Sequence, residues 1–174
     1  MAEMEEKKYK IFSVKNYNQA NKKFIEENEQ IYDIKKLEKE LKKDNYYNFR
    51  VHKNDRYVYF GDVDGLKTPI NDFIKILKDF LLKNYGLRFT DKEFKYTKNN
   101  KKEGSYHYSI PKWNCSCEKL KEIHTNLIKK NVDLKKIIDT TVYSEHWFRC
   151  PNQSKGNNEA NENKHIIIEG NMKN

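Results

Sequence analysis

Hydrophobic and polar positions are patterned most clearly in the middle of the chain. The apolar run Tyr57-Val58-Tyr59-Phe60 is typical of a strand, and it leads into Gly61-Asp62-Val63-Asp64-Gly65. Thr68-Pro69 is typical of a helix start, with a capping hydroxyl followed by proline at the first helical position. The apolar positions that follow recur at helical spacing as far as Gly86, so they predict an amphipathic helix.

The segments beyond this helix complete the pattern. Residues 89–97 and 105–110 favour two strands joined by a polar turn, with Pro111 ending the second strand. The apolar spacing over 120–128 predicts another amphipathic helix, and residues 137–143 favour a last strand. The order strand, helix, strand, strand, helix, strand predicts an α+β fold with a split βαβ sheet, as in RNA-recognition-motif domains.

The N-terminal part of the chain has a different pattern. We expect a short strand over 7–15, a polar helix over 19–31 and a second helix that begins after Asp33. These elements predict a small α/β accessory module over residues 1–47, followed by the main domain over residues 48–174.

Composition narrows the choice of partners. The chain has 174 residues, enough for one domain with a small module, and 36% of them are hydrophobic. Its 35 Lys and Arg residues exceed its 26 Asp and Glu residues, and the net charge is +9. This balance favours an anionic partner, with nucleic acid ahead of a membrane surface.

Cysteine content and hydropathy indicate the cellular compartment in which we expect the protein. Three cysteines are an odd number in a chain of this length and do not indicate a disulfide framework. Cys115 and Cys117 have one residue between them, where zinc sites usually have about two to four, and zinc at these residues and Cys150 stays open. No apolar run approaches the ~20 residues of a membrane span, and the N-terminus is too acidic for a secretory signal. We therefore expect a soluble, intracellular protein.

Asp62 and Asp64 form the first candidate site. On a strand, residues two apart point to the same face, so the two carboxylates lie side by side. Like charges at this distance repel unless a divalent cation holds both, and oxygen ligands suit Mg²⁺ or Mn²⁺. The alternative is an Asp-Gly turn with two solvated acids at the end of a core strand.

The predicted topology brings other polar side chains to the two acids. In a split βαβ sheet the first strand lies between the third and the last. Ser105 and His107 share one face of the third strand, and Asp139 lies on the last strand. Three acids and a histidine then converge on the face that the helices leave open.

These segments resemble the ordered motifs of the archaeo-eukaryotic primase superfamily. The resemblance is carried by Asp62-Val63-Asp64 after an apolar strand, by Ser105-Tyr106-His107 and by Asp139. It covers about residues 48–170 and is nearest to the primase-polymerase branch and to viral primase-helicase proteins. The flanking segments that look similar are Asn48-Phe49-Arg50, Trp147-Phe148-Arg149, Lys155 and His165-Ile166-Ile167-Ile168.

The resemblance implies template-dependent nucleotidyl transfer, as in a DNA primase or primase-polymerase. The implied partners are a DNA template, nucleoside triphosphates and a helicase domain or subunit. Two Mg²⁺ or Mn²⁺ ions would stabilise the attacking and leaving oxygens, held by Asp62, Asp64 and Asp139. The residues implied to bind the nucleotide are Ser105, His107, Arg149, Lys155 and Arg50.

Each residue also has a structural alternative. His107 can be a partly buried histidine that donates to a backbone carbonyl, and Asp139 can cap the turn before Val142. Arg149 and Lys155 can be solvated surface charges. It is their joint occurrence in this order that favours catalysis.

Two other function classes stay open. A non-catalytic domain of this fold binds single strands by stacking bases on exposed aromatic residues, for which Tyr143 is a candidate. Such a domain has no use for three convergent carboxylates, which repel phosphates unless metal ions intervene. A two-metal nuclease uses similar acids, but it gives no reason for the basic triphosphate-binding set.

Overall fold

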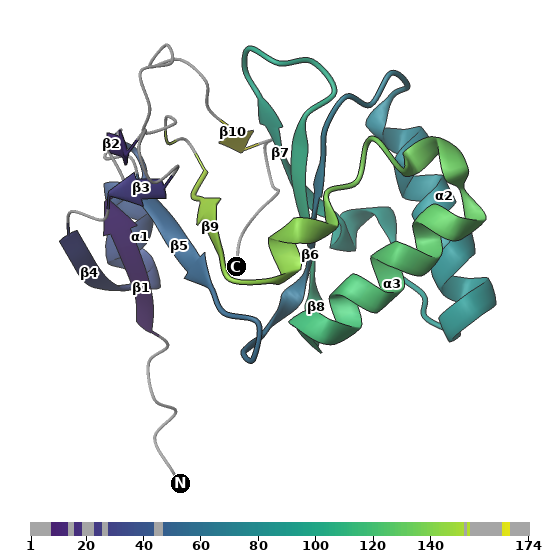
Figure 1. The fold of residues 1–174 in the computed structure, drawn as a ribbon, viewed down its shortest axis with the longest axis horizontal. Coiled ribbons are helices and arrows are strands. Elements are labelled where there is room, and N and C mark those ends of the chain that lie inside the picture. The colour runs from purple at the N-terminus through teal and green to yellow at the C-terminus, as the bar shows by residue number, and fades with distance from the viewer. Residues whose placement is uncertain are drawn as a thin grey trace, which may run out of the picture. The chain divides into compact units, whose positions relative to one another are not determined.

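The computed structural model describes residues 8–13, 16–18, 23–25, 28–43, 47–151, 153 and 165–167. The chain divides into two compact units, whose elements are labelled in Figure 1. The first unit comprises Met1–Arg50 and Trp147–Lys164, and the second comprises Val51–His146 and His165–Asn174. The domain boundary predicted after residue 47 stays a prediction.

The first unit is built on a four-stranded antiparallel sheet in the order β4-β1-β5-β9. Strand β1 pairs antiparallel with both β4 and β5, and β2 and β3 form a separate two-stranded ribbon. Its elements are β1 (Lys8–Ser13), β2 (Asn16–Asn18), β3 (Lys23–Ile25), β4 (Asn28–Asp33), α1 (Ile34–Glu40), β5 (Tyr47–Val51) and β9 (His146–Arg149).

The sequence predictions for this unit were partly right. Strand β1 and helix α1 are confirmed, but the polar helix predicted over residues 19–31 is wrong, because β3 and β4 lie there. This segment has few apolar residues and no stripe that a helix can bury. Pairing with β1 satisfies the backbone groups of β4 instead.

A small core joins the described side chains of the first unit. Leu37 of α1 and Cys150 are buried together, with Leu41 and Phe49 packed against them. A hydrogen bond links Gln153 to the segment after α1, because its amide nitrogen donates to the carbonyl of Lys43 at 2.9 Å. This core explains why the isolated apolar positions of α1 suffice for a seven-residue helix.

The second unit is built on a four-stranded antiparallel sheet in the order β10-β7-β8-β6. The predicted hairpin is confirmed as β7 and β8, and β6 carries Asp62 directly opposite His107 of β8. The mixed α+β class is therefore confirmed. The elements are β6 (Arg56–Val63), α2 (Ile70–Tyr85), β7 (Lys95–Asn99), β8 (Tyr106–Ser116), α3 (Cys117–Lys130) and β10 (His165–Ile167).

Helices α2 and α3 lie on the same side of this sheet (Figure 1). The ring centroids of Phe73 in α2 and Tyr108 in β8 are 5.4 Å apart, and those of His124 in α3 and Tyr59 in β6 are 5.3 Å apart. Tyr59, Phe73, Tyr108 and His124 are completely or almost completely buried. Helix α2 ends at Gly86 in the left-handed conformation, as predicted.

Four local predictions in the second unit were wrong in whole or in part. Residues 137–143 do not form a strand: Ile138 makes a single bridge to Val63, and a 3₁₀ turn follows over Thr140–Tyr143. The cause is local, because Asp139 accepts a hydrogen bond from the backbone of Thr141 and turns the chain.

Pro111 does not end β8, and Thr68 does not cap α2. Strand β8 continues to Ser116 because the register with β6 shifts between Val58 and Tyr59, so the pairing skips the proline.

Pro69 itself is the N-cap residue of α2, without a side-chain cap. The segment predicted as a strand over 89–97 begins with a 3₁₀ turn at Asp91–Glu93, and only its end belongs to β7.

No helix in the described part of the chain combines the length and the apolar character needed to cross a membrane.

Candidate functional site

Backbone pairing places two acids and a histidine in one row across the second unit's sheet. The backbone nitrogen of Asp139 donates to the carbonyl of Asp62 at 3.2 Å, and the nitrogen of Asp64 donates to the carbonyl of Ile137 at 2.8 Å. These bonds flank the bridge between Val63 and Ile138, so Asp139 stands opposite Asp62. His107 stands opposite Asp62 on the other side. Directly opposed side chains have Cβ atoms about 4.5–5.5 Å apart, so Asp139 and His107 are each neighbours of Asp62.

Asp62 and His107 form a close pair within this row. His107 Nε2 lies 3.6 Å from Asp62 Oδ1, and the two side chains are only 11% and 22% exposed. Because little water screens them, charges on this pair interact more strongly than charges at the surface. The predicted approach of the motif histidine to the first motif acid is thus seen in the structure.

Asp139 also caps the 3₁₀ turn that follows it. Its Oδ1 accepts hydrogen bonds from the backbone nitrogen of Thr141 at 2.9 Å and from the hydroxyl of Thr141 at 2.5 Å. This is the capping role that the sequence also allowed. An ionised carboxylate offers about four lone-pair sites, so capping through Oδ1 leaves capacity for a further ligand.

Asp64 lies just beyond the end of β6 and faces a lysine. Lys102 Nζ donates to Asp64 Oδ2 at 2.8 Å. Asp64 Oδ1 is buried and has no hydrogen-bond partner within the described part of the chain. Sequence reasoning missed Lys102. The one signal for it is its place in the turn between the strands over 89–97 and 105–110, at the end of the sheet where the acid pair was predicted.

The rest of this sheet face is polar and buried. His107 and Ser109 of β8 lie on it, Ser105 directly precedes this strand, and Thr97 of β7 stands opposite His107. As whole residues these four are at most 9% exposed, and so is Asn99. Buried polar groups need partners, which makes this face unlike an ordinary apolar core. Ser105, a predicted nucleotide ligand, thus lies next to the strand that carries His107.

The other predicted nucleotide ligands lie elsewhere in the chain. Arg50 belongs to β5 and Arg149 to β9, which are neighbours in the first unit's sheet. Lys155 lies outside the described residues. The structure therefore brings Asp62, Asp139 and His107 together in one unit, and the roles of the three basic residues stay predictions.

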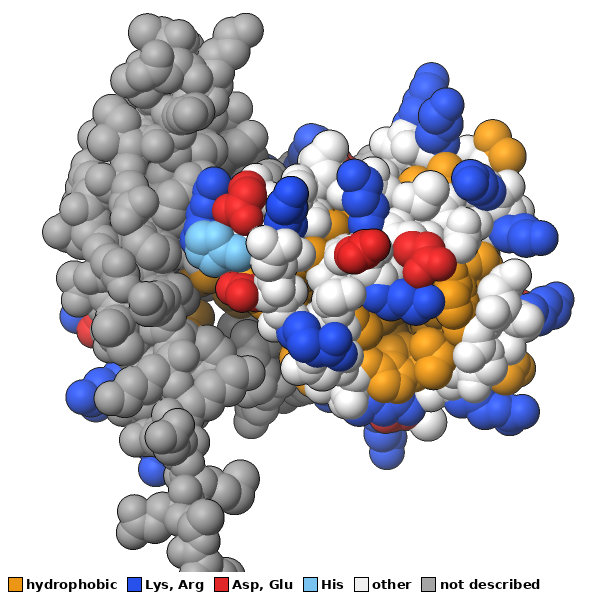
Figure 2. Space-filling model, turned by 60° about the horizontal axis from the view of Figure 1, so that its bottom comes forward, with side chains coloured by type: hydrophobic (Ala, Val, Ile, Leu, Met, Phe, Trp, Pro, Cys, Tyr) orange, Lys and Arg blue, Asp and Glu red, His pale blue; other side chains and the backbone are white. Residues whose placement is uncertain are grey.

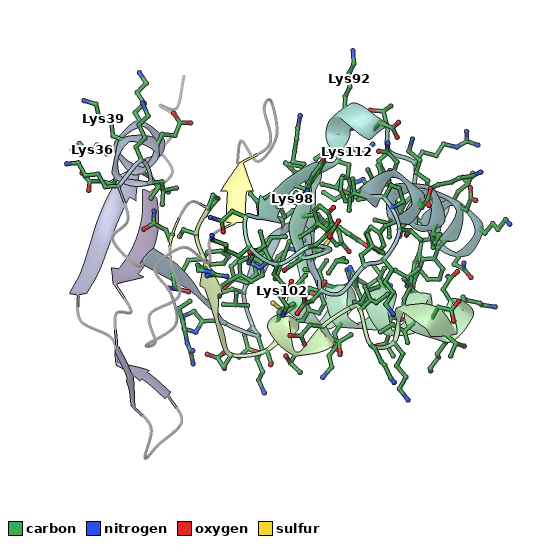
Figure 3. The ribbon with its side chains drawn as sticks, turned by 90° about the horizontal axis from the view of Figure 1, so that it is seen from above. Lys36, Lys39, Lys92, Lys98, Lys102 and Lys112 are labelled. Atoms are coloured by element: carbon green, nitrogen blue, oxygen red, sulfur yellow. The ribbon has the colours of Figure 1, made fainter. Side chains whose placement is uncertain are left out.

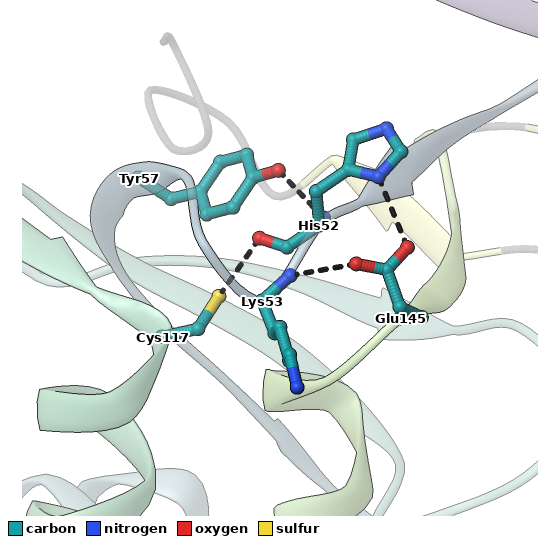
Figure 4. Close-up of polar contacts among 5 residues, drawn as sticks. All are labelled: His52, Lys53, Tyr57, Cys117 and Glu145. Atoms are coloured by element: carbon teal, nitrogen blue, oxygen red, sulfur yellow. Dashed lines mark hydrogen bonds and ion pairs between the residues drawn. The ribbon is translucent and has the colours of Figure 1, made fainter.

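A second polar cluster lies at the start of α3 (Figure 4). His52 Nδ1 lies 3.0 Å from Glu145 Oε2, and Glu145 Oε1 accepts from the backbone of Lys53 at 3.0 Å. Cys117 Sγ donates to the carbonyl of His52 at 3.7 Å, so the thiol does not face the imidazole. Burial raises the pKa of Cys117 to about 11, which keeps the thiol protonated near neutral pH. These residues do not form a cysteine–histidine nucleophile pair.

The remaining cysteines give no sign of a metal site. Cys150 is buried against Leu37 in the first unit, and burial raises its pKa to about 12. Burial also raises the pKa of Cys115. Within the described ranges, no three His, Cys, Asp or Glu side chains are grouped so that they could hold a metal ion. Any ion at the acid row needs ligands from a substrate or solvent as well.

Positive charge is distributed over several elements. Figure 2 shows Lys and Arg side chains over the described surface with Asp and Glu side chains between them. Figure 3 shows Lys36 and Lys39 on α1, and Lys98 and Lys102 at the β7–β8 hairpin. This distribution agrees with a diffuse attraction for polyanions rather than with one basic groove.

No model of a known protein family and no curated protein matches the chain.

Proposed function

We propose that the second unit carries a template-dependent nucleotidyltransferase site of the primase-polymerase type. The observation that carries the proposal is the row Asp139, Asp62 and His107, with Asp64 two residues after Asp62 along the chain. The motif resemblance requires three acids and a histidine on one sheet face, and this row supplies two of the acids and the histidine. A DNA template and nucleoside triphosphates are the proposed substrates, and a helicase domain or subunit is the proposed partner.

The order of the paired segments supports an RNA-recognition-motif-like sheet. Ile138 pairs with β6, β6 with β8 and β8 with β7, all antiparallel. This is the order of a split βαβ sheet in which Ile138 stands for the last strand. Both helices cover the opposite face, so the acid row lies on the face that such folds use for ligands.

The donor set fits Mg²⁺ or Mn²⁺. All three acids offer carboxylate oxygens, and the buried Oδ1 of Asp64 has no hydrogen-bond partner among the described residues. Mg²⁺ is commonly held by one or two carboxylates together with substrate phosphates, which agrees with a site that is incomplete by itself. Asp62, Asp64 and Asp139 would hold the ions, which would supply charge stabilisation for the attacking and leaving oxygens.

His107 and the nearby Ser105 are suited to bind the incoming nucleotide. When His107 is protonated it can donate to phosphate by a charge-assisted hydrogen bond. Ser105, just before the same strand, adds a neutral donor. Arg50, Arg149 and Lys155 are proposed as further phosphate ligands.

Stacking without chemistry has less support. Tyr143, the aromatic residue proposed for stacking, is buried, and its hydroxyl donates to the carbonyl of Phe60 at 2.7 Å. A buried ring that packs on the core offers no platform to a base.

The test is incubation of the full chain with a single-stranded DNA template, labelled nucleoside triphosphates and Mn²⁺. A primase-polymerase yields products whose composition follows the template. A nuclease shortens the template instead, and a binding domain leaves both substrates unchanged while shifting the template in a gel. Either of the last two results overturns the proposal. Asp62→Asn, assayed in parallel, shows whether any product comes from this site.

A further inference from the structure

Hydrogen bonds of Asn99 fix the start of the turn between β7 and β8. The side chain of Asn99 is 4% exposed, and its Oδ1 accepts from the backbone nitrogens of Lys101 and Lys102, at 2.9 Å each. The backbone nitrogen of Asn99 also donates to the carbonyl of Ser105 at 2.9 Å. An asparagine that bonds the next backbone groups in this way fixes the path of a turn.

The end of the turn is fixed by a close contact between Gly104 and Leu66. The carbonyl of Gly104 accepts from the backbone of Leu66 at 3.1 Å. Gly104 has a φ of 78°, and a Cβ built there would lie 2.2 Å from the carbonyl oxygen of Leu66. Only glycine permits this approach. Because Leu66 is two residues after Asp64, the turn is docked on the segment that carries this acid.

Lys102 meets Asp64 because of this docking. Its Nζ lies 2.8 Å from Asp64 Oδ2, and the two side chains are 60% and 45% exposed. At such exposure an ion pair adds little to stability. Its effect on ligand binding is more direct, since the ammonium group contacts the same carboxylate that is proposed to receive a metal ion.

We propose that Lys102 is a built-in counter-ion of Asp64 that a divalent cation has to displace. This inference rests on the proposed function, which assigns Asp64 to the metal site. In the metal-free protein the ammonium group offsets the charge of Asp64. When Mn²⁺ binds, Lys102 leaves Oδ2, and the loss of that contact lowers the apparent metal affinity.

The experiment is a titration of the full chain with Mn²⁺ alone, with free Mn²⁺ followed by electron paramagnetic resonance. Lys102→Met removes the competing cation and is expected to tighten Mn²⁺ binding roughly two- to fivefold, the range of an exposed ion pair. Lys102→Arg keeps a cation and is expected to retain the wild-type affinity. Circular dichroism verifies that each variant is folded.

Lys98→Met is the charge-matched control. Lys98 is an exposed lysine of the same hairpin, but it alternates with Thr97 and Asn99 and therefore lies on the other face of β7. Its loss reports the general effect of removing one positive charge, and we expect less than about a 1.5-fold change. Figure 3 shows both lysines.

The outcomes separate this inference from the proposed function. Equal tightening in the Lys102→Met and Lys98→Met variants means that only net charge matters, and weaker binding in Lys102→Met means that Lys102 supports the site. Either result overturns the inference while the metal site stands. If Asp64→Asn leaves Mn²⁺ binding unchanged, Asp64 is no metal ligand, and the metal assignment fails together with the inference.

Discussion

One histidine lies on each side of the second unit's sheet, and the groups that surround the two imidazole rings differ in chemistry. His124 lies on the helix-covered face, completely buried among aromatic rings. His107 lies on the other face, next to an acid. The residue type is the same, so the difference in chemistry comes from the groups that surround each ring.

His124 is satisfied as a neutral side chain. Its Nδ1 donates to the carbonyl of Leu120 at 2.7 Å, so its Nε2 is the acceptor and the hydroxyl of Tyr108 donates to it. Burial lowers the pKa of His124 to about 4, although the bond to Leu120 opposes the shift. This is the structural role, with a bond to a backbone carbonyl, that the sequence allowed for His107.

The comparison predicts that changes on the open face remove activity, whereas changes on the helix face remove stability. The largest expected effect is that of Asp62→Asn, which removes the charge of a proposed metal ligand. Nucleotide incorporation should fall by roughly a thousandfold, because the metal ion supplies several kcal/mol of transition-state stabilisation. The free energy of unfolding should change by less than about 1 kcal/mol. Primer extension and urea unfolding measure the two quantities.

Two variants sharpen this test. Asp79→Asn removes an exposed acid of α2 and should leave extension unchanged. Asp139→Asn should behave like Asp62→Asn, and asparagine retains an oxygen that accepts from Thr141, so the cap survives. Extension near the wild-type level in either Asp62→Asn or Asp139→Asn contradicts the assignment of the acid row.

The second prediction is that the free energy of unfolding falls with pH because of His124 on the helix-covered face of the sheet. The pKa of His124 is lower in the folded chain than the ~6.5 of an unfolded one, so its contribution is complete above pH 6.5 and is lost as pH falls towards 4. Between pH 6.5 and 5 the loss amounts to about 2 kcal/mol. Urea unfolding at several pH values should show this slope in the wild type and not in His124→Gln.

The exposed His52 provides the matched control. His52→Gln removes a histidine that is 53% exposed, so it should retain the wild-type slope between pH 6.5 and 5. A slope that survives in His124→Gln assigns the titration to another group.

Sequence patterns predicted the elements that carry a strong period. The α2 and α3 helices repeat their apolar positions at helical spacing, β6 contains a continuous apolar run, and burial of those positions decides the structure. Residues 137–143 were mistaken for a strand because a side-chain bond from Asp139 decides their path, and such a bond leaves no period. Pro111 was mistaken for a strand end because a register shift accommodates it.

The candidate site was predictable to the extent that strand alternation determines it. Asp62, His107 and Asp139 fall on one face once the strands are placed in order. Lys102 was missed because its contact with Asp64 depends on how Gly104 docks against Leu66, which is a tertiary contact. His124 was missed although it lies four residues after Leu120, on the same stripe.

The third effect returns to the open face. His107→Ala should raise the nucleotide concentration for half-maximal extension about ten- to a hundredfold, because a charge-assisted bond contributes roughly 1.5–3 kcal/mol. Template affinity should stay nearly constant, since many lysines would share the proposed contact with DNA. Extension kinetics and fluorescence anisotropy on a labelled template measure the two. Equal losses in both assays assign His107 to the fold or to the template surface.

The smallest effect tests how closely the helix face is packed. A Cβ at Gly61 would lie 2.4 Å from Cζ of Tyr108, so Gly61→Ala forces the ring to move. Tyr108 is held by the hydrogen bond to His124 and by Phe94, whose ring stacks on it at 5.0 Å, and overpacking of this kind costs about 1–3 kcal/mol. Urea unfolding measures the cost. In the double variant with Tyr108→Leu the smaller side chain removes the clash, so adding Gly61→Ala to Tyr108→Leu should cost less than adding it to the wild type. An equal cost in both backgrounds means that the backbone of β6, rather than the ring of Tyr108, requires the glycine.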